Sequence, residues 1–62
     1  MALGDAQVHY DLGAAYAEMG LSVDAIVELE TATRLDPENV AFESALAMLR
    51  KLREQLGLRP TR

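Results

Sequence analysis

The stretch Leu12-Gly13-Ala14-Ala15-Tyr16 places a glycine inside a helical pattern of small and large residues. Leu12 and Tyr16 are one turn apart, so both side chains point to one face. A glycine in the middle of a helix costs about 1 kcal/mol relative to alanine, so Gly13 indicates a close approach by another backbone. A thin apolar stripe that could make this approach follows at helical spacing: Ala25, Leu29 and Ala32. The pattern predicts two antiparallel helices packed through small residues.

Local signals divide the chain into three helices, which makes the predicted fold all-α. The first helix covers about 6–19, with Asp5 as N-cap and Gly20 as a left-handed stop. Ser22 is the predicted cap of the second helix. That helix ends near Leu35, because Pro37 disfavours a helical residue before it. Its apolar residues cover more than one stripe, so we expect it to contact both other helices.

The third helix is predicted to start at Pro37 or Glu38, with Asp36 as its cap, and to end at Gly57. Its packing stripe is Phe42, Ala45, Leu46, Leu49, Leu52 and Leu56.

Small and large residues from both sides of the first turn together resemble one known repeat: Leu12, Gly13, Tyr16, Gly20, Ala25, Leu29, Ala32 and Pro37. The pattern is similar to the tetratricopeptide repeat, a helix-turn-helix unit of about 34 residues. One full repeat would run from about 6 to 39. His9 and Leu29 depart from the pattern, which often has a large apolar residue and an aromatic residue at these places.

The resemblance implies a single helical hairpin over 6–39 and a capping helix over 37–57. Together they would form a right-handed superhelical fragment with three helices. Residues 1–5 are expected to be frayed, and 58–62 to form a tail. The third helix resembles the start of a second repeat, but Arg50 stands where a tyrosine is expected. The outer face of the first helix, around Val8, Ala15 and Met19, is expected to be incompletely covered.

The 62-residue chain is short enough for its stability to be marginal. It has no cysteine and one histidine, so neither a disulfide nor a zinc site is expected to stabilise it. The sequence contains no membrane-spanning segment and no secretory signal, from which we expect a cytoplasmic location. We also expect the chain to be part of a larger protein or assembly.

Charge divides unevenly along the sequence. Residues 1–49 hold nine acidic and one basic residue, and residues 50–62 hold five basic and one acidic, giving −8 and +4. The basic end is either a solvated helix end or a surface that meets an acidic partner, including the acidic face of a second copy. No aromatic residue alternates with the basic ones, so nucleic-acid binding is not expected.

The concave face implied by the resemblance is the candidate partner-binding surface. It comprises residues of the first helix: Gln7, Tyr10, Asp11, Ala14, Ala17 and Glu18. The family members that bind carboxylates use Lys and Asn on this face. Tyr10 and Ala14 stand at the matching places and favour an apolar or aromatic anchor on a partner helix. Alternatively, these positions are plain surface or are buried in self-association.

No set of residues predicts catalysis, a cofactor or a metal site. His9 has no cysteine or serine partner at motif spacing. Asp24 and Glu28 lie one turn apart but are typical of a solvated acidic helix, and Glu30 is placed to pair with Arg34. The sequence therefore predicts a protein-interaction module that binds a protein or helical peptide and forms a homo-oligomer, with a dimer expected. The alternative is a purely structural homo-oligomerisation domain without a ligand groove.

Overall fold

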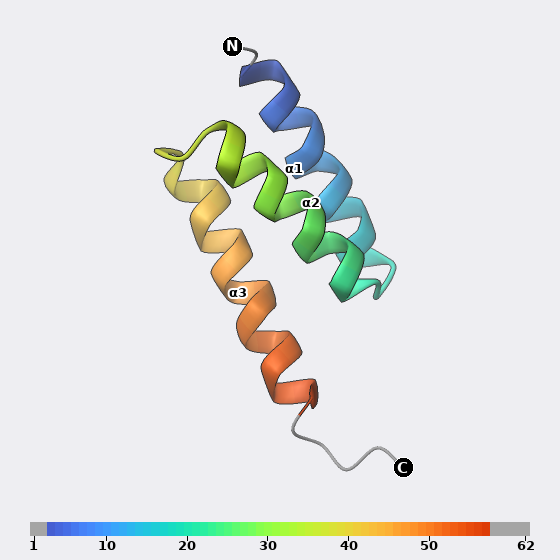
Figure 1. Cartoon of the computed structure of the whole chain (residues 1–62). Helices are drawn as coiled ribbons and strands as arrows, with labels where there is room; N and C mark the ends of the chain where they lie inside the picture. The colour runs from blue at the N-terminus through green and yellow to red at the C-terminus, as the bar shows by residue number, and fades with distance from the viewer. Residues whose placement is uncertain (1–2, 58–62) are drawn as a thin grey trace.

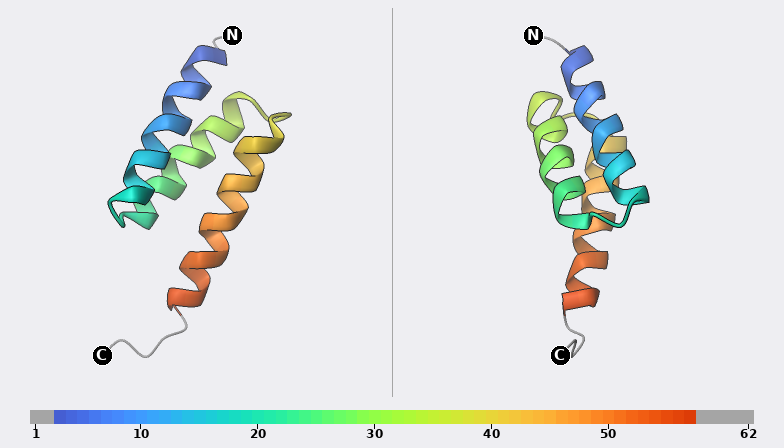
Figure 2. Two further views of the ribbon diagram at one scale, coloured as in Figure 1. Left: turned by 180° about the vertical axis from the view of Figure 1, so that it is seen from behind. Right: turned by 90° about the vertical axis from the view of Figure 1, so that its right-hand side faces the viewer.

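Three α-helices form the part of the chain that this computed structural model describes, residues 3–57. They are α1 (Leu3–Glu18), α2 (Ser22–Leu35) and α3 (Val40–Gly57). α1 and α2 run side by side in opposite directions, and α3 turns back along α2 and separates from it toward its C-terminal end (Figures 1 and 2). The all-α prediction is confirmed. The predicted superhelical course stays a prediction, and residues 1–2 and 58–62 lie outside the described range.

Gly13 lies where α2 packs closely against α1. It is buried, and a Cβ atom added there would lie 3.0 Å from Cγ of Leu29 and 3.2 Å from the carbonyl oxygen of Ala25. Ala25 is fully buried on the facing helix. The predicted reason for a mid-helix glycine is therefore confirmed, since even a Cβ atom there would be in tight contact with α2.

α2 lies at the centre and packs against both other helices, as predicted. One buried cluster joins Ala6 of α1, Ala32 of α2 and Phe42 of α3. A second cluster on the same central helix consists of Ile26, Leu29 and Leu46. Tyr10 packs against both clusters. The core is therefore small but continuous across all three helices.

α3 is anchored by its N-terminal half. Phe42 is 3% exposed and Leu46 is 8% exposed, whereas Leu52 is 47% exposed. Ala45 and Leu49 are half-buried and pack against the second cluster. The predicted stripe is thus correct for four residues and wrong for Leu52, because α3 has moved away from α2 at that point (Figure 2). The side chain of Leu56, the last residue of the predicted stripe, lies outside those that the structure describes.

Gly20 ends α1 in the way that its sequence position predicts. Its φ of 80° is in the left-handed region. The Gly20 N–H donates to the carbonyl of Ala17 at 3.0 Å, and the Leu21 N–H donates to the carbonyl of Tyr16 at 2.9 Å. These two bonds form a Schellman ending, which satisfies carbonyls that the helix leaves free.

The predicted starts of α1 and α2 are corrected by the structure. α1 begins at Leu3, so Asp5 lies within its first turn and is not the N-cap, and residues 3–5 are helical rather than frayed. α2 begins at Ser22 itself, and Leu21 holds the N-cap position without a side-chain hydrogen bond. The reason is the short turn after Gly20, which leaves Leu21 as the only residue between the turn and the helix.

The start of α3 also differs from the prediction. α3 begins at Val40, because Pro37 lies in a turn closed by the Asn39 N–H donating to the Asp36 carbonyl at 3.1 Å. Asn39 Nδ2 donates to the Asp36 carboxylate at 3.1 Å, and Asn39 Oδ1 accepts from the Phe42 N–H at 3.1 Å. Asn39, not Asp36, is therefore the N-cap, and Pro37 is not the first helical residue.

Replacing Asn39 with alanine is expected to lower the unfolding free energy by about 1 kcal/mol, because the Phe42 N–H loses its acceptor. In a domain of this size, that loss lowers the melting temperature by roughly 4–8 °C. Thermal melts followed by circular dichroism test this, with Asn39→Ser as the control that keeps a capping oxygen. Equal melting of the alanine and serine variants would contradict the assigned cap.

Candidate binding groove

An apolar groove lies between α1 and α3, with α2 beneath it. Its volume is about 310 Å³. The residues that line it come from all three helices: Tyr10, Ala14 and Ala17 from α1, Leu29 from α2, and Ala45, Met48 and Leu49 from α3. The α1 residues are spaced by four and three, which puts them on one face. Two of them are alanines, so α1 leaves space at this point rather than filling it.

The chemistry of the groove is uniform. No lining residue is charged, and the Tyr10 hydroxyl is the one polar side-chain group in the lining. The volume is at the small end of the range for ligand pockets, about 300–1,000 Å³. The groove therefore suits one or two apolar side chains that a partner presents, and its lining contains no cationic side chain to pair with a carboxylate.

Three of the six predicted surface residues line this groove: Tyr10, Ala14 and Ala17. Gln7 and Asp11 lie outside it, exposed, with Gln7 Nε2 donating to Asp11 Oδ1 at 2.9 Å. Glu18 is exposed and is not part of the lining. The sequence prediction missed the wall that α3 contributes, Ala45 and Met48. Their spacing of three, beside the Phe42–Leu46–Leu49 stripe, is the signal of a second apolar face on that helix.

Tyr10 has a larger role than an edge residue of the groove. Its ring stacks on Phe42 of α3 with centroids 4.7 Å apart and an interplanar angle of 20°. It also packs against both buried clusters. A Tyr10→Ala substitution would therefore disturb folding as well as the groove, and exposed Ala14 is the better position for a test of binding.

A second apolar surface lies along α1 and the turn that follows it, and we call it the α1 stripe. It consists of Val8 and Leu12 of α1 and Met19 of the turn, which are 61%, 41% and 66% exposed. Ala15 is exposed as well, so the prediction of an incompletely covered outer face around Val8, Ala15 and Met19 is confirmed. Leu12, expected as a packing residue, is half outside the core, because Gly13 is the residue that faces α2.

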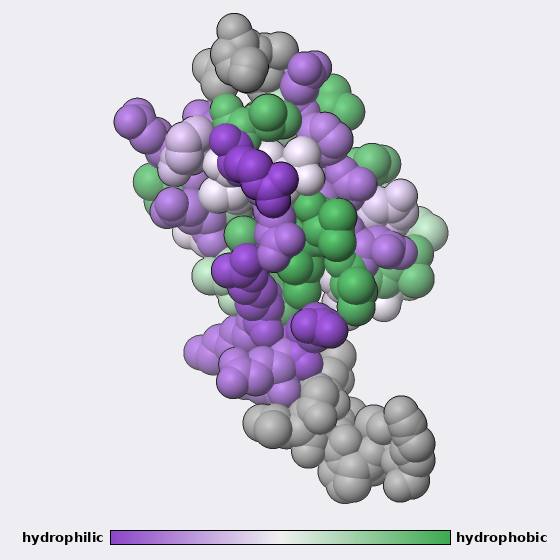
Figure 3. Space-filling model, viewed as in Figure 1, coloured by the Kyte–Doolittle hydropathy of each residue, from purple (hydrophilic) through white to green (hydrophobic). Residues whose placement is uncertain are grey.

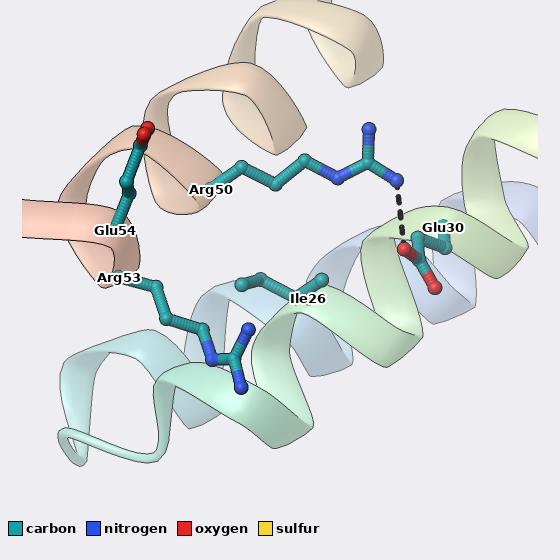
Figure 4. A pocket seen from close by; sticks show the side chains of 5 residues that line it. All are labelled: Ile26, Glu30, Arg50, Arg53 and Glu54. Atoms are coloured by element: carbon teal, nitrogen blue, oxygen red, sulfur yellow. Dashed lines mark hydrogen bonds and ion pairs between the residues drawn. The ribbon is translucent and has the colours of Figure 1, made fainter. Parts of the chain in front are cut away.

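A hollow of about 510 Å³ opens where α2 and α3 separate, and we call it the α2–α3 cleft. Its lining consists of Ile26, Glu30, Arg50, Arg53 and Glu54 (Figure 4). Arg50 Nη2 donates to Oε2 of Glu30 at 2.7 Å across the cleft. The predicted pairing of Glu30 with Arg34 is therefore wrong, since the Glu30 carboxylate binds the neighbouring helix instead. On the face shown in Figure 3, apolar side chains gather over α2 and hydrophilic ones over α3.

His9 ties α1 to α2. Its Nδ1 lies 2.7 Å from Oε1 of Glu28, and both side chains are partly exposed. Glu28 is thus engaged by the histidine and does not form a carboxylate pair with Asp24. Within residues 3–57, His, Asp and Glu side chains do not gather in threes as metal ligands would. None of the three described helices has the length and apolar character needed to cross a membrane.

Comparison with protein-family models, with curated proteins and with solved structures finds no match to this chain. The groove, the α1 stripe and the α2–α3 cleft are therefore interpreted from their own geometry.

Proposed function

We propose that this protein is a protein-interaction module whose α1–α3 groove binds apolar side chains of a partner segment. The observation that carries the proposal is the uncharged lining of the groove, formed by three helices that the Tyr10–Phe42 stack holds together. An apolar anchor entering such a preformed site gains from burial without leaving a charge unpaired. A helical segment with leucine or phenylalanine at i and i+4 matches this surface.

The scaffold that we propose is a tetratricopeptide-like hairpin with α3 as a capping helix, self-associating and part of a larger protein or assembly. Support comes from the close approach of α2 to Gly13 and from the left-handed glycine between the two helices. The position of α3, packed on α2 with Phe42 against Ala6 and Ala32, also supports it. The proposal assigns no catalytic residue and no cofactor.

The alternative is a purely structural homo-oligomerisation domain with no separate ligand groove. The α1 stripe favours it, because three large apolar side chains that are 41–66% exposed are a ready surface for a second copy. The two functions differ in whether the α1–α3 groove remains open once copies have associated.

Ala14→Glu is expected to abolish binding in the groove while leaving the fold intact. Ala14 is exposed and lines the groove, so the substitution removes no buried group but places a carboxylate where an apolar side chain would sit. Helical peptides selected against the wild-type protein from a displayed library serve as the probe, and their affinities are measured by fluorescence anisotropy. We expect the substitution to weaken binding by at least about tenfold.

Ala47→Glu on α3 is the matched control. It makes the same chemical change at an exposed helical position that is not part of the groove lining, so peptide affinity should not change. Unfolding curves of both variants check that the helices are retained. If the selected peptides bind the Ala14 and Ala47 variants equally well, they occupy another surface and the proposed groove function is wrong.

A further inference from the structure

Two surfaces outside the groove have complementary chemistry, the α1 stripe and the α2–α3 cleft. Val8 and Leu12 are one turn apart on α1, and Met19 lies just after the end of the helix, seven residues beyond Leu12, with exposed Ala15 between them. Around this stripe α1 is acidic. It carries Asp5, Asp11 and Glu18, and it contains no lysine or arginine.

The α2–α3 cleft has one apolar lining residue at its floor, Ile26, which is 9% exposed, and charged side chains around it. Ile26 lies between the side chains of Arg50 and Arg53, which both extend from α3 toward α2 (Figure 4). Val23, three residues before Ile26 on α2, is 54% exposed but is not part of the cleft lining. The lining has two carboxylates. That of Glu30 is bound by Arg50, and that of Glu54 points away from Ile26 (Figure 4).

Positive charge exceeds negative charge along this side of the molecule. An adjoining hollow of about 440 Å³ is lined by Arg34 and Arg50 together with Glu30, Thr33 and Leu46. Over the two hollows, three arginines face two glutamates. Among the ion pairs found within residues 3–57, Arg50 is the one cleft arginine that has a carboxylate partner. Arg53 is therefore available to a carboxylate brought by another molecule.

We propose that copies of this chain associate head to tail, with the α1 stripe of one copy seated in the α2–α3 cleft of the next. The stripe of Val8, Leu12 and Met19 would cover Ile26, and the carboxylates of α1 would approach Arg53 and Arg34. Pairing of one stripe with another would instead bring two acidic helices together without a cation. This inference rests on the self-association part of the proposed function and not on the α1–α3 groove.

A head-to-tail contact uses two different surfaces, so an open assembly keeps one free stripe at one end and one free cleft at the other. Such contacts build open chains, or rings if the rotation closes. A single helix ridge in a cleft falls in the class of small, transient interfaces, below about 1,200 Å² in total. Association is therefore expected at high protein concentration, and the test must extend to about 1 mM.

The test mixes two variants that each disable one surface. The stripe variant carries Leu12→Gln and Met19→Gln, both at exposed positions and both to a good helix former. The cleft variant carries Arg53→Glu, also exposed and also helix-compatible. Mass is measured by sedimentation equilibrium over a concentration series for the wild type, each variant and an equimolar mixture, with circular dichroism as the check of folding.

The expected result is that the wild-type mass rises with concentration, that each variant alone remains a monomer, and that the mixture forms a one-to-one complex. The complex forms because the intact stripe of the cleft variant fits the intact cleft of the stripe variant. Stripe-to-stripe pairing predicts something different: the Arg53→Glu variant would dimerise alone and the mixture would add nothing. That outcome, or a wild-type protein that is monomeric at every concentration, would overturn the proposal.

The Ala14→Glu variant separates this inference from the groove function. Ala14 lines the α1–α3 groove and is not part of the stripe or the cleft lining. We expect this variant to self-associate as the wild type does while losing the selected peptides. Loss of self-association in this folded variant would place the contact between copies in the groove and would contradict the head-to-tail arrangement.

Discussion

Gly13→Leu is expected to leave the protein largely unfolded at room temperature. Even the first added atom, Cβ, would lie 3.0 Å from Leu29 Cγ and 3.2 Å from the backbone carbonyl of Ala25. Leu29 is 2% exposed at the centre of the core, so it has little space into which it can move. Overpacking of a core typically costs about 1–3 kcal/mol, and a leucine at a helix crossing belongs at or above the top of that range.

The effect is large because the reserve of stability is small. A single core in a chain of this length rarely provides more than about 3–5 kcal/mol. Circular dichroism at the helical minimum, followed by a thermal melt, measures the loss of structure directly. Leucine is a sharper probe than alanine, because both gain similar helix propensity over glycine but leucine adds three more carbon atoms at the crossing.

Gly4→Leu is the matched control on the same helix. A Cβ atom at Gly4 meets nothing within 4 Å, so the substitution gains helix propensity without a collision. We expect this variant to melt at or above the wild-type temperature. A Gly13→Leu protein that melts like the Gly4→Leu protein would show that α2 does not approach α1 at Gly13, and the described packing of the two helices would be wrong.

Phe42→Ala is expected to destabilise the protein by about 3–5 kcal/mol. Phe42 is 3% exposed, packs with Ala6 and Ala32, and stacks on Tyr10 at 4.7 Å. Both alanines are too small to refill the space, so truncation leaves a cavity at the point where α3 joins α1 and α2. Denaturant unfolding monitored by circular dichroism measures the loss.

Met48→Ala tests whether position on α3 or burial causes this effect. Met48 is on the same helix and is also a large apolar residue, but it is 70% exposed. Its truncation should change the unfolding free energy by less than about 0.5 kcal/mol. Similar losses for Phe42→Ala and Met48→Ala would mean that α3 is not docked through Phe42, and the α1–α3 groove would lose its far wall.

Features that depend on the backbone of a few neighbouring residues are predictable from this sequence. Gly20 ends a helix because it can adopt a positive φ, and Pro37 ends another because of its effect on the residue before it. Gly13 signals a close approach because a mid-helix glycine is otherwise unfavourable. The exact caps were less predictable, although Asp5, Ser22 and Asp36 all have suitable side chains. The lengths of the turns place Leu21 rather than Ser22 at the N-cap of α2, and Asn39 rather than Asp36 at the N-cap of α3.

The candidate site was predicted in part. Tyr10, Ala14 and Ala17 could be placed on one face of α1 from their spacing alone, but the groove also needs Ala45 and Met48 of α3. Which faces of two helices meet depends on their rotation and crossing, and these are set by side chains far apart in the chain. The same holds for the ion pair of Glu30. Its carboxylate binds Arg50, which is 20 residues away in the sequence, and not Arg34 on the same helix.

The sequence by itself therefore determined that the described residues, 3–57, fold as three helices, approximately where the turns between them lie, and that α1 and α2 meet at Gly13. Only the tertiary structure decided that Leu12 and Leu52 are half outside the core and that Tyr10 stacks on Phe42. The α1–α3 groove and the α2–α3 cleft likewise exist only because of how α3 packs against the other two helices. The physical reason is the distance in sequence over which each feature is determined. Helix ends and the conformations of glycines depend on neighbouring residues of the backbone. Side-chain exposure, ring stacking and surface hollows depend on the angle and rotation at which the helices cross.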